Sequence, residues 1–159
     1  MAELVSFYDI KIIYACGRAA LSIIFSIFAV INTQEPLLLM LKNDKKLLDA
    51  ITEAIQEKKG SDIVIADFSK MSGVAYRYFV ICQGNTAIQV EAIAREIGEY
   101  VREHADEKPM AVSGLENAIW VAMDYGQVIV HIFQPEARDF YDLEHLWEDA
   151  KLTYIPNDF

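Results

Sequence analysis

The order of apolar and polar residues predicts a helix and then two strands at the start of the regular part of the chain. The apolar side chains of the helix recur three and four positions apart, at Leu47, Leu48, Ile51 and Ile55. Asn43 or Asp44 can cap its start, and Gly60 can end it. Short β-branched and aromatic runs at 62–67 and 76–82 predict two strands, the first of them in the interior of a sheet.

The pattern continues with a second helix and a pair of strands. Thr86 and Gln89 have the spacing of a capping box. The helix that they open has one apolar face, made of Val90, Ile93, Ile97 and Tyr100 or Val101. The runs at 118–123 and 128–133 are separated by a short turn, which is typical of an antiparallel hairpin.

The last periodic segment is a helical stretch that begins at Pro135 and runs through Trp147. The resulting order is α-β-β-α-β-β-α. It predicts an α/β (α+β) fold with a single mixed β-sheet and helices packed on it.

Residues 1–39 follow a different pattern. They carry three acidic and two basic side chains, a net charge of −1, and residues 19–34 hold no charge. That run is shorter than the roughly 20 apolar residues of a membrane-spanning helix, and it lacks the leading charge and cleavage site of a signal peptide. We therefore expect a domain at 40–159, with residues 1–39 as upstream sequence included by a wrongly chosen start codon. A membrane anchor and a docked extra helix are the alternatives.

Charge and cysteine usage narrow the classes of function. The 159 residues include 24 acidic and 14 basic side chains, for a net charge of −10. Proteins that grip nucleic-acid phosphates need a basic surface, so direct nucleic-acid binding is not expected. A basic protein partner suits this charge better. Cys16 and Cys82 have no disulfide or metal-ligand spacing, which fits a reducing compartment.

Three places along the chain share features with catalytic or ligand-binding sites. Gly84–Thr86 ends a strand and opens a helix, where backbone N–H groups can hold an anion, but it lacks the P-loop and dinucleotide-binding motifs. Asp142 and Glu144 lie two apart on a predicted helix and are not expected to share a magnesium ion. His131 is expected to be a buried residue hydrogen-bonded to a neighbour. A nucleotide-binding enzyme that uses the Gly84–Thr86 turn stays as the alternative function.

Five segments resemble, in order and spacing, the ribosomal silencing factor (Iojap) family. They cover nearly all of residues 44–150: Lys58–Asp67, Tyr78–Gly84, Trp120–Asp124, Val128–Phe133 and Ala137–Trp147. The resemblance implies a fold similar to that of nucleotidyltransferases without their activity, no cofactor, and a cytoplasmic location. It also implies binding to the large ribosomal subunit through its protein fourteen, at the face where the small subunit docks. The bound factor would obstruct subunit joining and lower translation when nutrients are short.

The resemblance also implies which residues contact the ribosomal partner. Apolar anchors are expected at Trp120, Met123, Tyr141 and Leu146. Carboxylates that face basic side chains of the partner are expected at Asp124, Asp142, Glu144 and Glu148. Tyr78 completes the set, whereas Trp147 is expected in the core.

Two departures from the family pattern accompany this resemblance. Many members have Asp where this chain has Arg77, so a contact made by that acid is not expected here. The family lacks an apolar extension like residues 1–39, which favours the wrong-start interpretation. A homodimer is an alternative assembly, and no membrane contact is expected unless residues 1–39 act as an anchor.

Overall fold

The computed structural model describes residues 39–71, 75–146 and 149–157. A helix at residues 39–57 comes first. The elements that follow are β1 (Ser61–Asp67), β2 (Tyr78–Gln83), α3 (Ala87–His104), β3 (Ala111–Ser113), β4 (Trp120–Asp124), β5 (Val128–Phe133), α4 (Pro135–Tyr141), α5 (Leu143–Leu146) and β6 (Lys151–Ile155). The expectations for residues 1–39 fall outside the described residues, apart from residue 39 itself.

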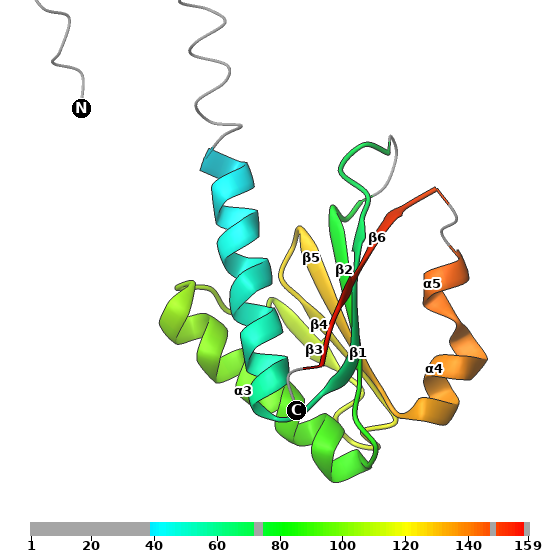
Figure 1. The fold of residues 1–159 in the computed structure, drawn as a ribbon. Helices are drawn as coiled ribbons and strands as arrows, with labels where there is room; N and C mark the ends of the chain where they lie inside the picture. Colours follow the sequence, from blue (N-terminus) through cyan, green and yellow to red (C-terminus); the bar gives the residue numbers. More distant parts are fainter. Residues whose placement is uncertain (1–38, 72–74, 147–148, 158–159) are drawn as a thin grey trace, which may run out of the picture. The chain divides into compact units, whose positions relative to one another are not determined.

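The strands form one mixed sheet in the order β3-β4-β5-β2-β1-β6 (Figure 1). β2 and β5 are parallel, and the other neighbouring pairs are antiparallel. The predicted hairpin consists of β4 and β5, with Trp120 opposite Phe133 and Asp124 opposite Ile129. β1 is paired on both sides, as expected of an interior strand. The predicted fold class, a single mixed sheet with packed helices, is therefore confirmed.

The predicted order of elements lacks the two edge strands and misplaces the end of a helix. β3 has three residues, all exposed, so no apolar alternation marks it in the sequence. β6 is short and is defined by its pairing with β1. The continuous helix predicted from Pro135 to Trp147 is wrong. α4 ends at Tyr141 because Asp142 takes a left-handed conformation with φ of 42°, and α5 is a separate short helix.

The first helix begins earlier than predicted. Residues 39–57 are helical, so Asn43 and Asp44 lie inside the helix and do not cap it. Asp44 is 8% exposed, and its carboxylate forms an ion pair with Arg77 Nη1 at 2.6 Å. Asp44, which has the pattern of a cap in the sequence, is thus the ion-pair partner of Arg77, just before β2.

The start of α3 confirms the predicted capping residues. Thr86 is the N-cap, and its Oγ1 accepts a hydrogen bond from Gln89 N–H at 3.1 Å. Gln89 Oε1 accepts from Asn85 N–H at 2.8 Å, while its Nε2 donates to the carbonyl of Lys59 at 2.9 Å. This side chain therefore closes the start of α3 and ties it to the turn after the first helix. The predicted apolar face is buried through Val90, Ile93, Ala94, Ile97 and Val101.

The sheet has two faces of different character (Figure 1). Residues 43–57 of the first helix and α3 cover one of them, which we call the helical face; its strand side chains include Ile63, Val80, Cys82, Val121, Met123, Val128, Val130 and Ile132. α4 and α5 lie on the other, which we call the aromatic face; its strand side chains include Phe79, Ile81, Trp120, His131 and Phe133. Successive residues of a strand point to opposite faces, so each of these strands contributes to both.

Candidate protein-binding site

A row of aromatic rings crosses the aromatic face from β2 to α4. Phe79 and His131 meet edge to face with their ring centroids 4.9 Å apart. Trp120 stacks on Phe133 at 5.0 Å and packs against Tyr141 at 4.8 Å. Aromatic pairs at these separations attract each other beyond the effect of burial alone. The rings can form a row because β4, β5 and β2 are neighbours in the sheet.

His131 lies within this row and is 7% exposed. Trp120 Nε1 donates a hydrogen bond to His131 Nδ1 at 3.3 Å, so Nδ1 carries no proton. Burial lowers the pKa of His131 from 6.5 to about 4, because the charged imidazolium would lose its hydration. The imidazole is neutral at physiological pH. The prediction of a buried histidine hydrogen-bonded to a neighbour is confirmed.

The outer surface of α4 and α5 exposes large apolar side chains. Phe140 is 80% exposed, Leu146 66% and Tyr141 49%, and we call these three residues the ridge. Ile119 is also exposed, and its carbonyl accepts a hydrogen bond from the N–H of Gln134, the residue that precedes α4, at 2.8 Å. Grouped apolar side chains of this kind mark interaction surfaces.

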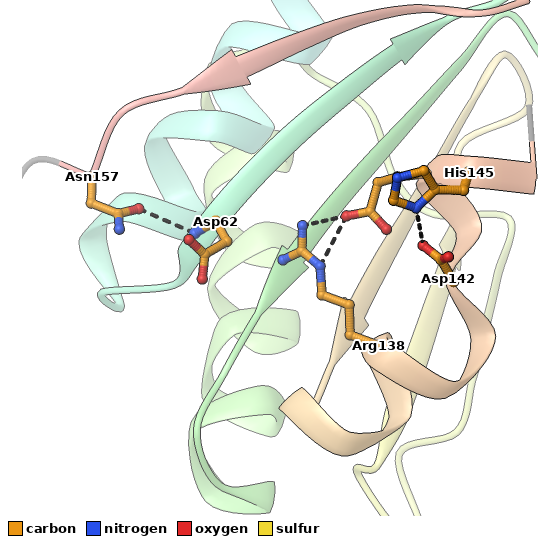
Figure 2. Close-up of polar contacts among 6 residues, drawn as sticks. Asp62, Arg138, Asp142, His145 and Asn157 are labelled. Atoms are coloured by element: carbon orange, nitrogen blue, oxygen red, sulfur yellow. Dashed lines mark hydrogen bonds and ion pairs between the residues drawn. The ribbon is translucent and has the colours of Figure 1, made fainter. Parts of the chain in front are cut away.

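Carboxylates accompany the ridge and the aromatic face. Asp139 and Asp142 are exposed at the end of α4. Asp124 is half-buried on β4, two positions along the same face from Ala122 and four from Trp120, and its Oδ1 accepts a hydrogen bond from Gly126 N–H at 2.7 Å. The site therefore combines aromatic surface with negative charge, and Asp142 Oδ1 lies 2.5 Å from Nδ1 of His145, the neighbour of Leu146 on α5 (Figure 2).

An ion pair joins α4 to α5 (Figure 2). Arg138 Nε donates to Glu144 Oε1 at 3.0 Å, and Arg138 Nη2 donates to the same oxygen. The two side chains are 11% and 13% exposed. Paired in this way, Glu144 balances the charge of a largely buried guanidinium within the chain and does not project outward as the expected rim carboxylate would. This corrects the expected role of Glu144.

The Arg138–Glu144 pair borders a pocket of about 590 Å³ that β1 and the end of β6 also line. On the opposite side of the pocket, Asn157 Oδ1 accepts from Asp62 N–H at 3.1 Å (Figure 2). Asp142 and Glu144 both line it, and the continuous helix predicted to carry both is absent, because the chain turns left-handed at Asp142. Within the described ranges, no three potential metal ligands lie close enough to hold an ion.

Strand alternation separates two of the expected site residues from the others. Met123 is 2% exposed and packs in the core of the helical face, which corrects its expected role as an anchor. Tyr78 packs against the same core, and the Arg77 guanidinium lies 5.9 Å from its ring centroid. Trp120 and Asp124 remain together on the aromatic face, since they lie four apart on β4. Glu148 and Trp147 lie outside the described residues.

Sequence reasoning missed several members of the aromatic row. The expected contacts lack Phe79 and Phe133 from the row and Phe140 from the ridge, and they leave His131 in the core. The parity of strand positions is a signal for two of them, because His131 and Phe133 lie two apart on β5 and share a face. The exposure of Phe140 has no comparable signal, since it depends on where α4 packs.

The Gly84–Thr86 turn is occupied by its own hydrogen bonds. Gly84 N–H donates to the carbonyl of Phe133 at 2.9 Å, and Asn85 N–H donates to Gln89 Oε1. Gly84 is buried, and a side chain there would meet Val90 Cγ2 at 3.0 Å. The glycine is thus explained by the close approach of α3. This geometry gives the nucleotide-binding alternative no support.

Comparisons with known proteins agree on one family. A family model described as "Ribosomal silencing factor during starvation" matches residues 42–158. The chain is 42% identical over 114 residues to the ribosomal silencing factor RsfS of Bacillus subtilis, covering 70% of this chain and 92% of that protein. It is 30% identical over 115 residues to the chloroplastic protein Iojap of Zea mays, covering 69% of this chain and 46% of that protein.

A solved structure is similar as well. A crystal structure of a protein from Chromobacterium violaceum superposes with a TM-score of 0.62 at 30% identity, covering 72% of this chain and 94% of that one. In the part of the chain that the structure describes, no helix combines the length and the hydropathy needed to cross a membrane.

Proposed function

The chain belongs to the ribosomal silencing factor family, and from this premise we propose that it binds the large ribosomal subunit through ribosomal protein fourteen and sterically blocks docking of the small subunit. The proposed action is stoichiometric and involves no covalent step and no cofactor. Translation falls when the factor holds a large fraction of the large subunits.

The observation that carries this proposal is the ridge beside the aromatic row. Phe140, Tyr141 and Leu146 expose large apolar surface on two consecutive short helices. Trp120 lies directly behind Tyr141 and is half-buried. Tryptophan and tyrosine at the centre of such a surface are the residue types that carry most of the binding energy in protein interfaces.

Charge supports a basic partner. The net charge of −10 favours encounter with a protein rich in lysine and arginine, as proteins that contact RNA phosphates are. Asp142 and Asp139 flank the ridge and lie exposed. Charges in these rim positions raise the rate of association more than the final affinity.

Co-sedimentation of the full chain with purified ribosomal subunits tests the proposal. The protein is expected to follow the large subunit, and excess protein is expected to reduce subunit joining measured by light scattering. Phe140→Ala and Tyr141→Ala should each weaken binding by roughly tenfold or more. Ile88→Ala is the matched control, because Ile88 is 81% exposed at the start of α3, on the helical side of the sheet.

Two outcomes contradict the proposal. If the wild-type protein does not sediment with the large subunit, the large subunit is not its partner. Equal loss of binding in Ile88→Ala and Phe140→Ala removes the ridge from the interface. Calorimetry with nucleotides and magnesium tests the alternative, a nucleotide-binding enzyme, which requires saturable nucleotide binding.

A further inference from the structure

His131 connects the buried part of the aromatic face to Trp120. We propose that His131 is a positioning residue for partner binding, whose Nδ1 accepts the hydrogen bond that holds the Trp120 indole in the orientation that supports Tyr141 in the ridge. This inference rests on the proposed function for its binding consequence. The positioning itself is a property of the free protein and can be measured without a ribosome.

The hydrogen bond is the first support. The indole Nε1–H is the single polar group of Trp120, and it donates to His131 Nδ1 at 3.3 Å. Both side chains are at least half-buried. Without this acceptor, the indole N–H would have to lose a hydrogen bond or turn toward solvent, and either change alters the ring position.

Cross-strand geometry is the second support. Trp120 faces Phe133 and Ala122 faces His131 in the β4–β5 register, so Trp120 and His131 form a diagonal pair on the aromatic face. Their ring centroids are 5.8 Å apart. Because Ala122 has only a methyl group, the imidazole and the indole can meet across it.

The environment of His131 is the third support. Phe79 contacts the imidazole from β2, while neither its own strand nor β2, β4 or α4 contributes an ion pair to it among the described residues. A histidine in such surroundings stays neutral at physiological pH. The Trp120 indole N–H that points at Nδ1 then selects the tautomer whose proton is on Nε2, a buried atom with no hydrogen-bond partner among the described residues. The link from His131 to the ridge then runs through Trp120, which packs against Tyr141 at 4.8 Å.

The test compares four full-length variants: His131→Leu, His131→Asn, Trp120→Phe and the double variant Trp120→Phe/His131→Leu. Leucine removes the Nδ1 acceptor and fills the site with an apolar side chain. Asparagine can place its side-chain oxygen where Nδ1 was and so restore an acceptor. The NMR signal of the Trp120 indole N–H reports the hydrogen bond directly. The second tryptophan, Trp147, supplies an internal reference signal, and a Trp147→Phe sample assigns the two.

The expected result is a changed Trp120 indole shift in His131→Leu and a shift near the wild-type value in His131→Asn. Large-subunit binding should weaken three- to tenfold in His131→Leu, the range of one hydrogen bond, and recover in His131→Asn. In the Trp120→Phe background, His131→Leu should have no further effect on binding.

The outcomes separate the inference from the function on which it rests. An unchanged Trp120 indole shift in folded His131→Leu overturns the inference, whatever the binding. Additive losses in the double variant also overturn it, because they place His131 outside the Trp120 pathway. A changed shift together with no wild-type binding to the large subunit refutes the proposed function and leaves the Trp120–His131 link intact. Melting curves and spectral dispersion show that each variant is folded.

Discussion

The two faces of the sheet differ in what covers them. The helical face lies under residues 43–57 of the first helix and the 18 residues of α3, and its aliphatic side chains are almost fully buried. The aromatic face carries helices of seven and four residues, which leave the ridge exposed. The same strands supply both faces. The longer helices therefore bury their face almost completely, whereas the short helices leave the ridge exposed beside the buried residues of the other face, where we propose that the partner binds.

The two faces also differ in residue type for a physical reason. β-Branched aliphatic residues pack densely between a sheet and a long helix, and they have no polar atoms to satisfy. Rings extend further than the short helices above them, and the tryptophan N–H finds an acceptor in the histidine Nδ1. The side chains of a partly covered face can therefore hold one arrangement before a partner binds.

The largest expected effect is on stability, from the helical face. Ile97 is fully buried, so Ile97→Ala should lower the free energy of unfolding by about 3–4 kcal/mol through lost burial and a cavity. Tyr141→Ala, at 49% exposed, should lower it by about 1 kcal/mol at most. Urea denaturation measures both. Equal losses in the two variants would contradict the difference in burial between the helical face and the ridge.

The next effect comes from the ion pair beneath the ridge. Glu144→Gln leaves the Arg138 guanidinium, 11% exposed, without its charged partner, and should cost about 2–3 kcal/mol of stability. The double variant Arg138→Met/Glu144→Leu should recover most of that loss, because it removes both charges. Thermal melting compares the three proteins. A double variant less stable than Glu144→Gln would show that the pair does more than satisfy the buried arginine.

The pH dependence of stability separates the two faces further. Unfolded His131 gains a proton near pH 6.5, whereas folded His131 gains it only near pH 4. Between these values the unfolded state binds more protons, so stability falls as the pH is lowered. The His131 contribution should amount to about 2 kcal/mol between pH 7 and pH 5.

His131→Asn, which cannot titrate, is the control for this effect. Its stability should fall less steeply from pH 7 to pH 5 in denaturant titrations, while groups such as Glu107 contribute equally to both proteins. Glu107 has a raised pKa because of its burial, which acts in the opposite direction. Parallel pH curves for the two proteins would contradict a neutral buried His131.

The smallest expected effect concerns the cap of α3. Thr86→Ala removes the oxygen that accepts from Gln89 N–H and should cost about 1 kcal/mol of stability. Large-subunit binding should not change, because α3 lies on the helical face, whereas the ridge is on α4 and α5 on the other face. Loss of large-subunit binding in a folded Thr86→Ala protein would contradict this prediction and indicate that the Gly84–Thr86 turn takes part in function.

Local patterns explain which predictions succeeded. Thr86 and Gln89 lie three apart, and the hydrogen bonds that they make need no distant partner. The β4–β5 hairpin is likewise set by two alternating runs and a short turn. The strand periodicity also contained the separation of Met123 from Trp120, since residues three apart on a strand point to opposite faces. The family resemblance placed both residues in one site because a match of motifs does not say to which face of the strand each side chain points.

Other features depended on contacts between distant segments. In the sequence Asp44 has the pattern of a helix cap, but in the fold it pairs with Arg77, which lies just before β2. Glu144 has the pattern of a surface carboxylate, but it pairs with Arg138 across the left-handed turn between α4 and α5. In both cases a charged residue is read as solvent-facing because charges usually are. Only its partner reveals that it is buried.

The sequence by itself determined the α/β (α+β) class, the apolar face of α3, the hairpin and the family, because each rests on periodicity or on motifs within a short stretch of chain. The tertiary structure alone decided that the rings of Phe79, His131, Trp120 and Tyr141 form one row and that the ridge beside it stays exposed. Those features follow from strand order and helix length. Neither has a local signature, since pairing β2 with β5 brings together residues about 50 positions apart.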